Sequence, residues 1–216
     1  MDRANLSKKI ISILGDVTRL TNTLYALNMA DIQRYPENYE TLSIDAALRG
    51  EQIACRLRHV VYTVTNQSKN RYLEMAADAQ DINIRQYDGI VEVTLPSLLT
   101  KRDKWKSMEF LLEPFTAAMN RYVREHDAPR YTHCVVCVTS VFDRALAERA
   151  VRDQDAIELK RYLDVITSFL LTDDNAILCD THGTVRLGER DHTIITIMEK
   201  ERFPIWLENS WQEDES

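Results

Sequence analysis

The sequence predicts an α+β protein with a helical extension over residues 1–85, a mixed domain over residues 86–207 and an acidic tail over residues 208–216. Apolar residues recur every three or four positions in the first part and every second position in several later runs, a difference that separates helices from strands. The chain has only five Gly and five Pro among its 216 residues, which favours long regular elements over loops.

The first 80 residues carry two apolar stripes with helical spacing. The first stripe predicts a helix over residues 5–27. Its apolar members are Leu6, Ile10, Ile13, Leu14, Val17, Leu20, Leu24 and Leu27. Pro36 interrupts the pattern, a second stripe runs from Leu48 to Val64, and a third short helix is expected over residues 71–80. No catalytic motif occurs in this part, so we expect two or three helices that serve packing or dimerisation.

The mixed domain is expected to follow the order β-α-β-α-β-β. A strand is predicted over residues 90–95, ending at Pro96, and a helix over residues 108–126. The near-continuous apolar run at residues 131–143 predicts a buried strand. A helix over residues 156–171, a short strand over residues 176–180 and an alternating strand over residues 190–200 complete the domain.

No apolar run approaches the roughly 20 residues of a membrane helix. The N-terminal apolar run is too short for a signal peptide and lacks a small-residue cleavage site. We therefore expect a cytoplasmic protein without a membrane contact.

Four cysteines are present: Cys55, Cys134, Cys137 and Cys179. Cys134 and Cys137 form a CxxC pair, which invites a zinc or redox interpretation. However, the pair lies in the predicted strand over residues 131–143, where side chains three positions apart point to opposite faces. We therefore expect these residues to be thiols of the core.

The charge balance is acidic, with 27 Lys and Arg against 34 Asp and Glu and a net charge of −7. A protein that holds a DNA duplex by neutralising its phosphates is usually basic. The charge therefore weighs against DNA binding through general electrostatic attraction.

The segment VRDQDAIELKRYLDVITSFLLTDDNAI contains the candidate site residues Asp153, Asp155, Lys160 and Asp174. A structural interpretation makes Asp155 a helix N-cap, Lys160 and Asp164 an i, i+4 ion pair, and Asp173 and Asp174 turn residues. In a functional interpretation, three carboxylates converge with one ammonium group, as divalent-metal hydrolysis of a phosphodiester requires.

The order of these motifs resembles the RusA-type Holliday-junction resolvases over residues 88–202. The matching stretches are VEVTLP, KRDKWK, the helix that follows, the strand HCVVCVTS, the acidic motif RDQDAIELKRYLD…TDDNAI and the closing strand TIITIMEK. The chain also looks like uncharacterised proteins from mobile elements of gut clostridia, including phage. The first resemblance implies a RusA-like fold and a homodimer that cuts branched DNA with Mg²⁺ or Mn²⁺.

The same resemblance implies a role for each matching residue. It makes Asp153, Asp155 and Asp174 the metal ligands and places Lys160 at the scissile phosphate. The loop residues expected to contact DNA are Lys101, Arg102, Lys104, Trp105 and Lys106.

Two departures from the family pattern keep a second function open. Ala156 stands where the family has Asn, and one extra residue separates Asp155 from Lys160. An extra helical residue rotates the lysine by about 100°. The alternative is a non-catalytic interaction protein on the same scaffold, such as an anti-CRISPR-type inhibitor that binds a host nuclease or its nucleic-acid complex.

Overall fold

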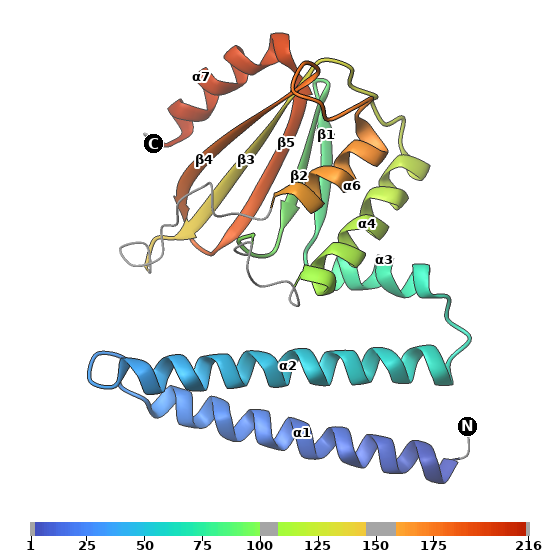
Figure 1. Ribbon diagram of the computed structural model, residues 1–216, viewed down its shortest axis with the longest axis vertical. Helices are drawn as coiled ribbons and strands as arrows, with labels where there is room; N and C mark the ends of the chain where they lie inside the picture. The colour runs from blue at the N-terminus through green and yellow to red at the C-terminus, as the bar shows by residue number, and fades with distance from the viewer. Residues whose placement is uncertain (1–2, 100–107, 146–158, 215–216) are drawn as a thin grey trace. The chain divides into compact units, whose positions relative to one another are not determined.

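The computed structural model describes residues 3–99, 108–145 and 159–214. The chain divides into two compact units, Met1–Lys69 and Asn70–Ser216. The described residues form six α-helices, one 3₁₀ helix and a five-stranded sheet (Figure 1). The predicted α+β class is therefore confirmed.

The first unit is a helical hairpin of α1 (Arg3–Met29) and α2 (Pro36–Val64). The two helices run antiparallel, because Asp16 on α1 pairs with Arg56 on α2 while Thr23 donates a hydrogen bond to Asp45 at 3.0 Å. Pro36 begins α2, where its missing N–H costs no helical hydrogen bond. The two predicted helical stripes are thus confirmed as helices.

The second unit begins with α3 (Lys69–Ala79), which is bound to α4 (Met108–Glu125) by ion pairs. Asp78 accepts two hydrogen bonds from Arg121, at 2.5 and 2.9 Å, and Glu74 pairs with Arg124 at 3.1 Å. The division between the units falls at residue 69 rather than at the expected boundary of 85, so α3 belongs to the same unit as the sheet.

A hairpin of β1 (Asn83–Tyr87) and β2 (Ile90–Leu95) follows α3. Its two-residue loop is Asp88-Gly89, and both residues have positive φ, 46° and 70°. Such loops are typical of type I′ turns, whose twist matches that of the strands they join. Strand β1 was not predicted from the sequence.

The sheet has the order β1-β2-β5-β3-β4, with β3 (Cys134–Asp143), β4 (Cys179–Gly188) and β5 (His192–Glu199). Every neighbouring pair is antiparallel except β3 and β4, which are parallel. From β2 onward the chain follows the predicted order β-α-β-α-β-β. The third predicted strand, over residues 176–180, corresponds to β4, but its predicted start is wrong, because residues 176–178 form a turn and the strand extends from Cys179 to Gly188.

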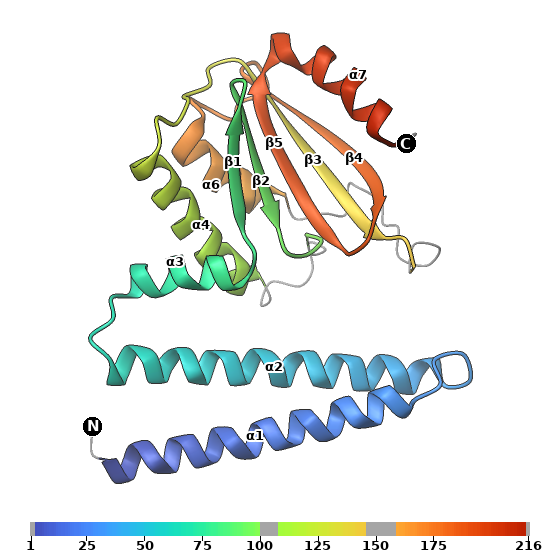
Figure 2. The ribbon, with the colours of Figure 1, turned by 180° about the vertical axis from the view of Figure 1, so that it is seen from behind.

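Helices cover the two faces of the sheet unequally. Helix α4 and helix α6 (Lys160–Leu170) pack on one face, where Phe115, Met119, Ile166 and Leu170 join the main core. Figure 1 shows α6 in front of the strands and Figure 2 shows it behind them. Helix α7 (Phe203–Asp214) packs on the other face through Phe203 and Trp206. Residues 208–214, expected as an acidic tail, continue this helix.

The CxxC pair occupies both faces, as predicted. Cys134 belongs to the main core and Cys137 to the smaller cluster under α7. Both are buried free thiols. Among the described residues, no helix is long and apolar enough to cross a membrane.

Candidate functional site

The candidate acidic site belongs to the β3–α6–β4 unit. The two strands are parallel, so the chain must cross over between them, and α6 is the crossover helix. Tyr162, Ile166 and Leu170 recur every four residues along α6 and are buried against the sheet. This packing leaves Lys160 and Asp164 on the exposed side of the helix.

Lys160, the first residue of α6, is held by its own helix. Its Nζ donates a hydrogen bond to Asp164 Oδ1 at 3.1 Å. The Asp164 carboxylate raises the pKa of Lys160 above its usual value, and the charge of Asp174 adds to this effect. The ion pair predicted between Lys160 and Asp164 is therefore confirmed, and Asp174 lies within electrostatic reach of the same ammonium group.

Asp174 lies in the turn that connects α6 to β4. The turn is fixed by its neighbours: Asp173 accepts from the backbone N–H of Asn175 at 3.2 Å and from its side-chain amide at 2.9 Å. These bonds, the side-chain bond first, hold the pKa of Asp173 below its usual value. Asn175 Oδ1 in turn accepts from the N–H of Ile177 at 3.1 Å. The half-buried carboxylate of Asp174 thus lies on an ordered turn, and Asp173 has a structural role there.

The start of this turn is paired with the chain that precedes β3. Leu171 forms a parallel bridge with Tyr131, and Thr172 donates its N–H to Tyr131 O at 2.9 Å. Cys134 then donates its N–H to Leu178 O at 2.8 Å, where the β3–β4 ladder begins. The position of Asp174 is therefore set by backbone pairing on both sides of the turn.

The other predicted site residues lie outside the described residues. These are Asp153 and Asp155 in the segment before α6, and Lys101, Arg102, Lys104, Trp105 and Lys106 in the segment before α4. Within the described residues, no three His, Cys, Asp or Glu side chains are grouped so as to hold a metal ion.

Of the three predicted metal ligands, the structure describes Asp174 alone. Mg²⁺ and Mn²⁺ prefer carboxylate oxygens, and Asp174 offers such a group from an ordered turn. The ammonium group of Lys160 is exposed and paired with Asp164, and the charge of Asp174 contributes to its raised pKa. Asp153 and Asp155 would have to supply the remaining protein ligands.

A second polar cluster, which the sequence reasoning missed, lies on the face of the sheet that carries α7. Glu92 on β2 accepts hydrogen bonds from Arg85 on β1 and, at 3.0 Å, from the hydroxyl of Tyr87. Its carboxylate raises the pKa of Arg85. Arg186 on β4 donates to Ser210 O on α7 at 2.9 Å. The sequence feature that could have revealed this cluster is the recurrence of polar residues at every second position of β1, β2 and β4, on the face opposite the core.

Comparison with known proteins places the chain in a family of unknown function (DUF6100), whose model matches residues 2–216. No curated protein matches the sequence.

Proposed function

We propose that this DUF6100 protein is a Mg²⁺-dependent, structure-selective DNA endonuclease of the RusA type, carried by a phage or other mobile element. The observation that supports the proposal is the parallel β3–α6–β4 unit, whose crossover helix begins at Lys160 and is followed by the ordered turn that holds Asp174. Lys160 and Asp174 are the members of the predicted site that the described residues contain, and an ammonium group and a carboxylate both serve in phosphodiester-cleaving sites.

In this proposal each predicted residue has one task. Asp153, Asp155 and Asp174 hold Mg²⁺ or Mn²⁺, which supplies an activated water and stabilises charge on the phosphate when it is bound. Lys160 contacts the scissile phosphate and neutralises its developing charge. The loop residues that position the DNA backbone are Lys101, Arg102, Lys104, Trp105 and Lys106.

A homodimer would bring two such sites to the two symmetric strands of a four-way junction. The helical hairpin of the first unit supports this part of the proposal, since many of its apolar side chains are exposed. On α1 the exposed apolar residues are Ile10, Ile11, Leu14, Val17, Leu24, Tyr25 and Met29. Ile10, Leu14, Val17 and Leu24 follow the three-and-four spacing of a helix-packing seam. Sedimentation of the full chain should give a dimer, which Leu14→Glu with Val17→Glu should convert to a monomer.

The nuclease proposal is tested with a labelled synthetic four-way junction and Mg²⁺ or Mn²⁺. Wild type should cut the junction, whereas Asp155→Asn and Asp174→Asn should reduce the cleavage rate at least 100-fold. Asp127→Asn is the matched control, because Asp127 is an exposed carboxylate elsewhere in the same unit and its substitution removes the same charge. The proposal fails if wild type leaves the junction intact, or if all variants cut equally.

A second candidate function is a catalytically degenerate interaction protein, such as an anti-CRISPR-type inhibitor that binds a host nuclease. The observation that favours it is the ion pair between Lys160 and Asp164, because a lysine already paired at 3.1 Å is less available to a phosphate. The net charge of −7 also suits competition with nucleic acid for a basic surface. Co-expression with a panel of nucleases that restrict a test phage should then restore plaque formation for at least one of them, and no restoration would contradict this function.

A further inference from the structure

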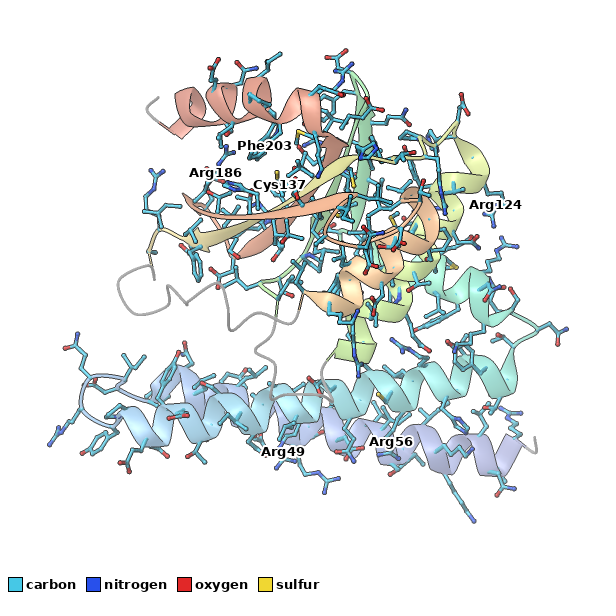
Figure 3. The ribbon with its side chains drawn as sticks, turned by 45° about the horizontal axis from the view of Figure 1, so that its top comes forward. Arg49, Arg56, Arg124, Cys137, Arg186 and Phe203 are labelled. Carbon is cyan, nitrogen blue, oxygen red and sulfur yellow. The ribbon has the colours of Figure 1, made fainter. Side chains whose placement is uncertain are left out.

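A cavity of about 590 Å³ lies on the sheet face that α4 and α6 leave uncovered. Its floor includes Thr139 on β3 and Thr196 on β5, and one wall is α7 with Ile205 and Trp206. Figure 3 shows Arg186 and Cys137 between α7 and the strands, beside Phe203. The cavity does not include Lys160 or Asp174, so it is separate from the candidate acidic site.

Two threonine hydroxyls line the floor, and neither forms a hydrogen bond with another residue that the structure describes. Thr139 and Thr196 are only 2% and 1% exposed. Thr193, on the opposite face of β5, is equally buried but donates to Ser97 O at 2.9 Å. A hydroxyl that lines a cavity and has no partner in the protein can bond to a ligand or to solvent there. The two hydroxyls are therefore available to a molecule in the cavity.

Three guanidinium groups line the same cavity, from Arg85, Arg186 and Arg202. Arg202 is exposed and forms no ion pair with any residue that the structure describes. A Cβ atom added to Gly89 would lie 3.4 Å from the Arg202 guanidinium carbon, which places this group against the β1–β2 turn at the rim. Two carboxylates, Asp88 and Glu92, also belong to the lining, so the cavity keeps an excess of positive charge in an acidic chain.

The wall formed by α7 offers a flat apolar surface. Trp206 stacks on Phe203, with ring centroids 6.2 Å apart and planes inclined by 23°. Ile205 is 65% exposed at the mouth, and Ile194 lies in the floor. An indole beside guanidinium groups is a combination that binds a planar ring through stacking and its anionic substituent through paired hydrogen bonds.

We infer that this cavity binds a flat organic anion of the size of a nucleoside monophosphate. The phosphate contacts Arg202 at the rim, the planar ring lies against Trp206, and the hydroxyls of Thr139 and Thr196 bond to polar atoms of the ligand. The volume falls within the roughly 300–1,000 Å³ of small-molecule sites.

Calorimetric titration of the full chain with adenosine monophosphate tests the inference. Inorganic phosphate, adenosine and benzoate serve as separate probes for the charge, the ring and an unrelated aromatic anion. Adenosine monophosphate should bind at least tenfold more tightly than any of these three. Arg202→Gln should weaken its binding at least fivefold, and Thr196→Val, which removes a hydroxyl at nearly constant volume, at least threefold. Arg190→Gln should leave the binding unchanged, since Arg190 is exposed and lies outside the lining.

Three results would overturn the inference: no binding of adenosine monophosphate, equal binding of phosphate or adenosine alone, or equal loss in the Arg202 and Arg190 variants. If benzoate binds more tightly than adenosine monophosphate, the cavity binds anions but not a nucleotide, and the inference is wrong. Circular dichroism of each variant checks that the fold is kept. If Arg202→Gln does not fold, the binding of adenosine monophosphate by Thr196→Val alone tests the inference.

Discussion

Lys160 donates a hydrogen bond to Asp164, one turn further along α6, at 3.1 Å. The order of the charges along the helix is lysine before aspartate, which is the weaker orientation of an i, i+4 pair. Both side chains are exposed, so the pair influences the charge state of Lys160 more than it stabilises the fold.

Replacing Asp164 should lower the pKa of Lys160. The carboxylate is the main cause of the raised pKa, and Asp164→Asn removes its charge while keeping the volume of the side chain. An NMR titration of the lysine side-chain resonances would follow the change. Asp180→Asn is the matched control, since Asp180 pairs with Lys200 instead at 2.8 Å. An unchanged or higher Lys160 pKa in Asp164→Asn would contradict the assignment.

The ion pair between Asp78 and Arg121 should make stability depend on pH below about 4. Arg121 holds the pKa of Asp78 below its usual value, so the folded state binds this proton less readily than the unfolded state. The stabilisation is therefore present above the unfolded pKa of about 3.9. It is lost as the pH falls through the folded pKa.

Because the Asp78 side chain is 57% exposed, this contribution is at most about 1 kcal/mol. Urea unfolding of wild type and Asp78→Asn at pH 6 and pH 3 should show a difference between the proteins at pH 6 that shrinks at pH 3. The control variant Asp127→Asn should have the same free energy of unfolding as wild type at both pH values. A difference that stays constant with pH would disprove the linkage.

The four thiols should differ sharply in reactivity. Cys55 is exposed, while Cys134, Cys137 and Cys179 are buried. Burial raises the pKa of Cys137 to about 12, so it is hardly ionised at pH 8. Hydrogen bonding between the other two raises the pKa of Cys134 and lowers that of Cys179, but both stay inside the sheet. A disulfide reagent at pH 8 should therefore label Cys55 first and the other three only in denaturant. Rapid labelling of four thiols in the native protein would refute this burial.

Two glycine substitutions should have opposite effects on stability. Gly89 has φ of +70° in the β1–β2 turn, so Gly89→Ala should destabilise the protein by about 1 kcal/mol. Gly50 lies inside α2 with nothing within 4 Å of an added Cβ, so Gly50→Ala should stabilise its helix by about 0.5–1 kcal/mol. Thermal unfolding measures both. A gain from Gly89→Ala would show that the turn does not have the positive φ described.

The helices and the inner strands could be predicted from the sequence because their apolar periodicity is strong. The eight predicted apolar positions on α1 lie within one helix, and β3 and β5 lie within the ranges that alternation and apolar runs indicated. Strand β3 is buried on both faces and β5 on most of its length, so their sequence patterns match the surroundings of their side chains, whereas α1 shows the helical period although most of its apolar side chains are exposed.

Strand β1 was missed because it is an edge strand with little burial. Its sequence NIRQY has no apolar alternation, and none of its residues is fully buried. The signal lay instead in the turn, where Asp88-Gly89 is a favoured two-residue hairpin loop. Helix α7 was missed for a different reason. Its second half is acidic, and only the contacts of Phe203 and Trp206 with the sheet show that the segment packs there.

The candidate site was predicted only in part. The pairing of Lys160 with Asp164 followed from helical spacing, whereas the position of Asp174 depends on the backbone pairing that fixes the turn after α6. The cavity beside α7 could not be predicted, since its lining comes from β1, β2, β3, β4, β5 and α7. Such a site follows from the order of strands in the sheet, which local periodicity does not determine.

The position of β5 has a consequence for biosynthesis. It is the last strand to leave the ribosome, yet it lies between β2 and β3 in the middle of the sheet. The β1–β2 hairpin and the β3–β4 pair therefore each present an open inner edge until residue 199 is available. Synthesis at about 5–20 residues per second leaves the β2 edge open for roughly 5–20 seconds and the edge of the β3–β4 pair for roughly 1–2 seconds. A nascent chain stalled before residue 192 should accordingly recruit chaperones and aggregate, while synthesis through residue 199 lets β5 insert and close both edges at once.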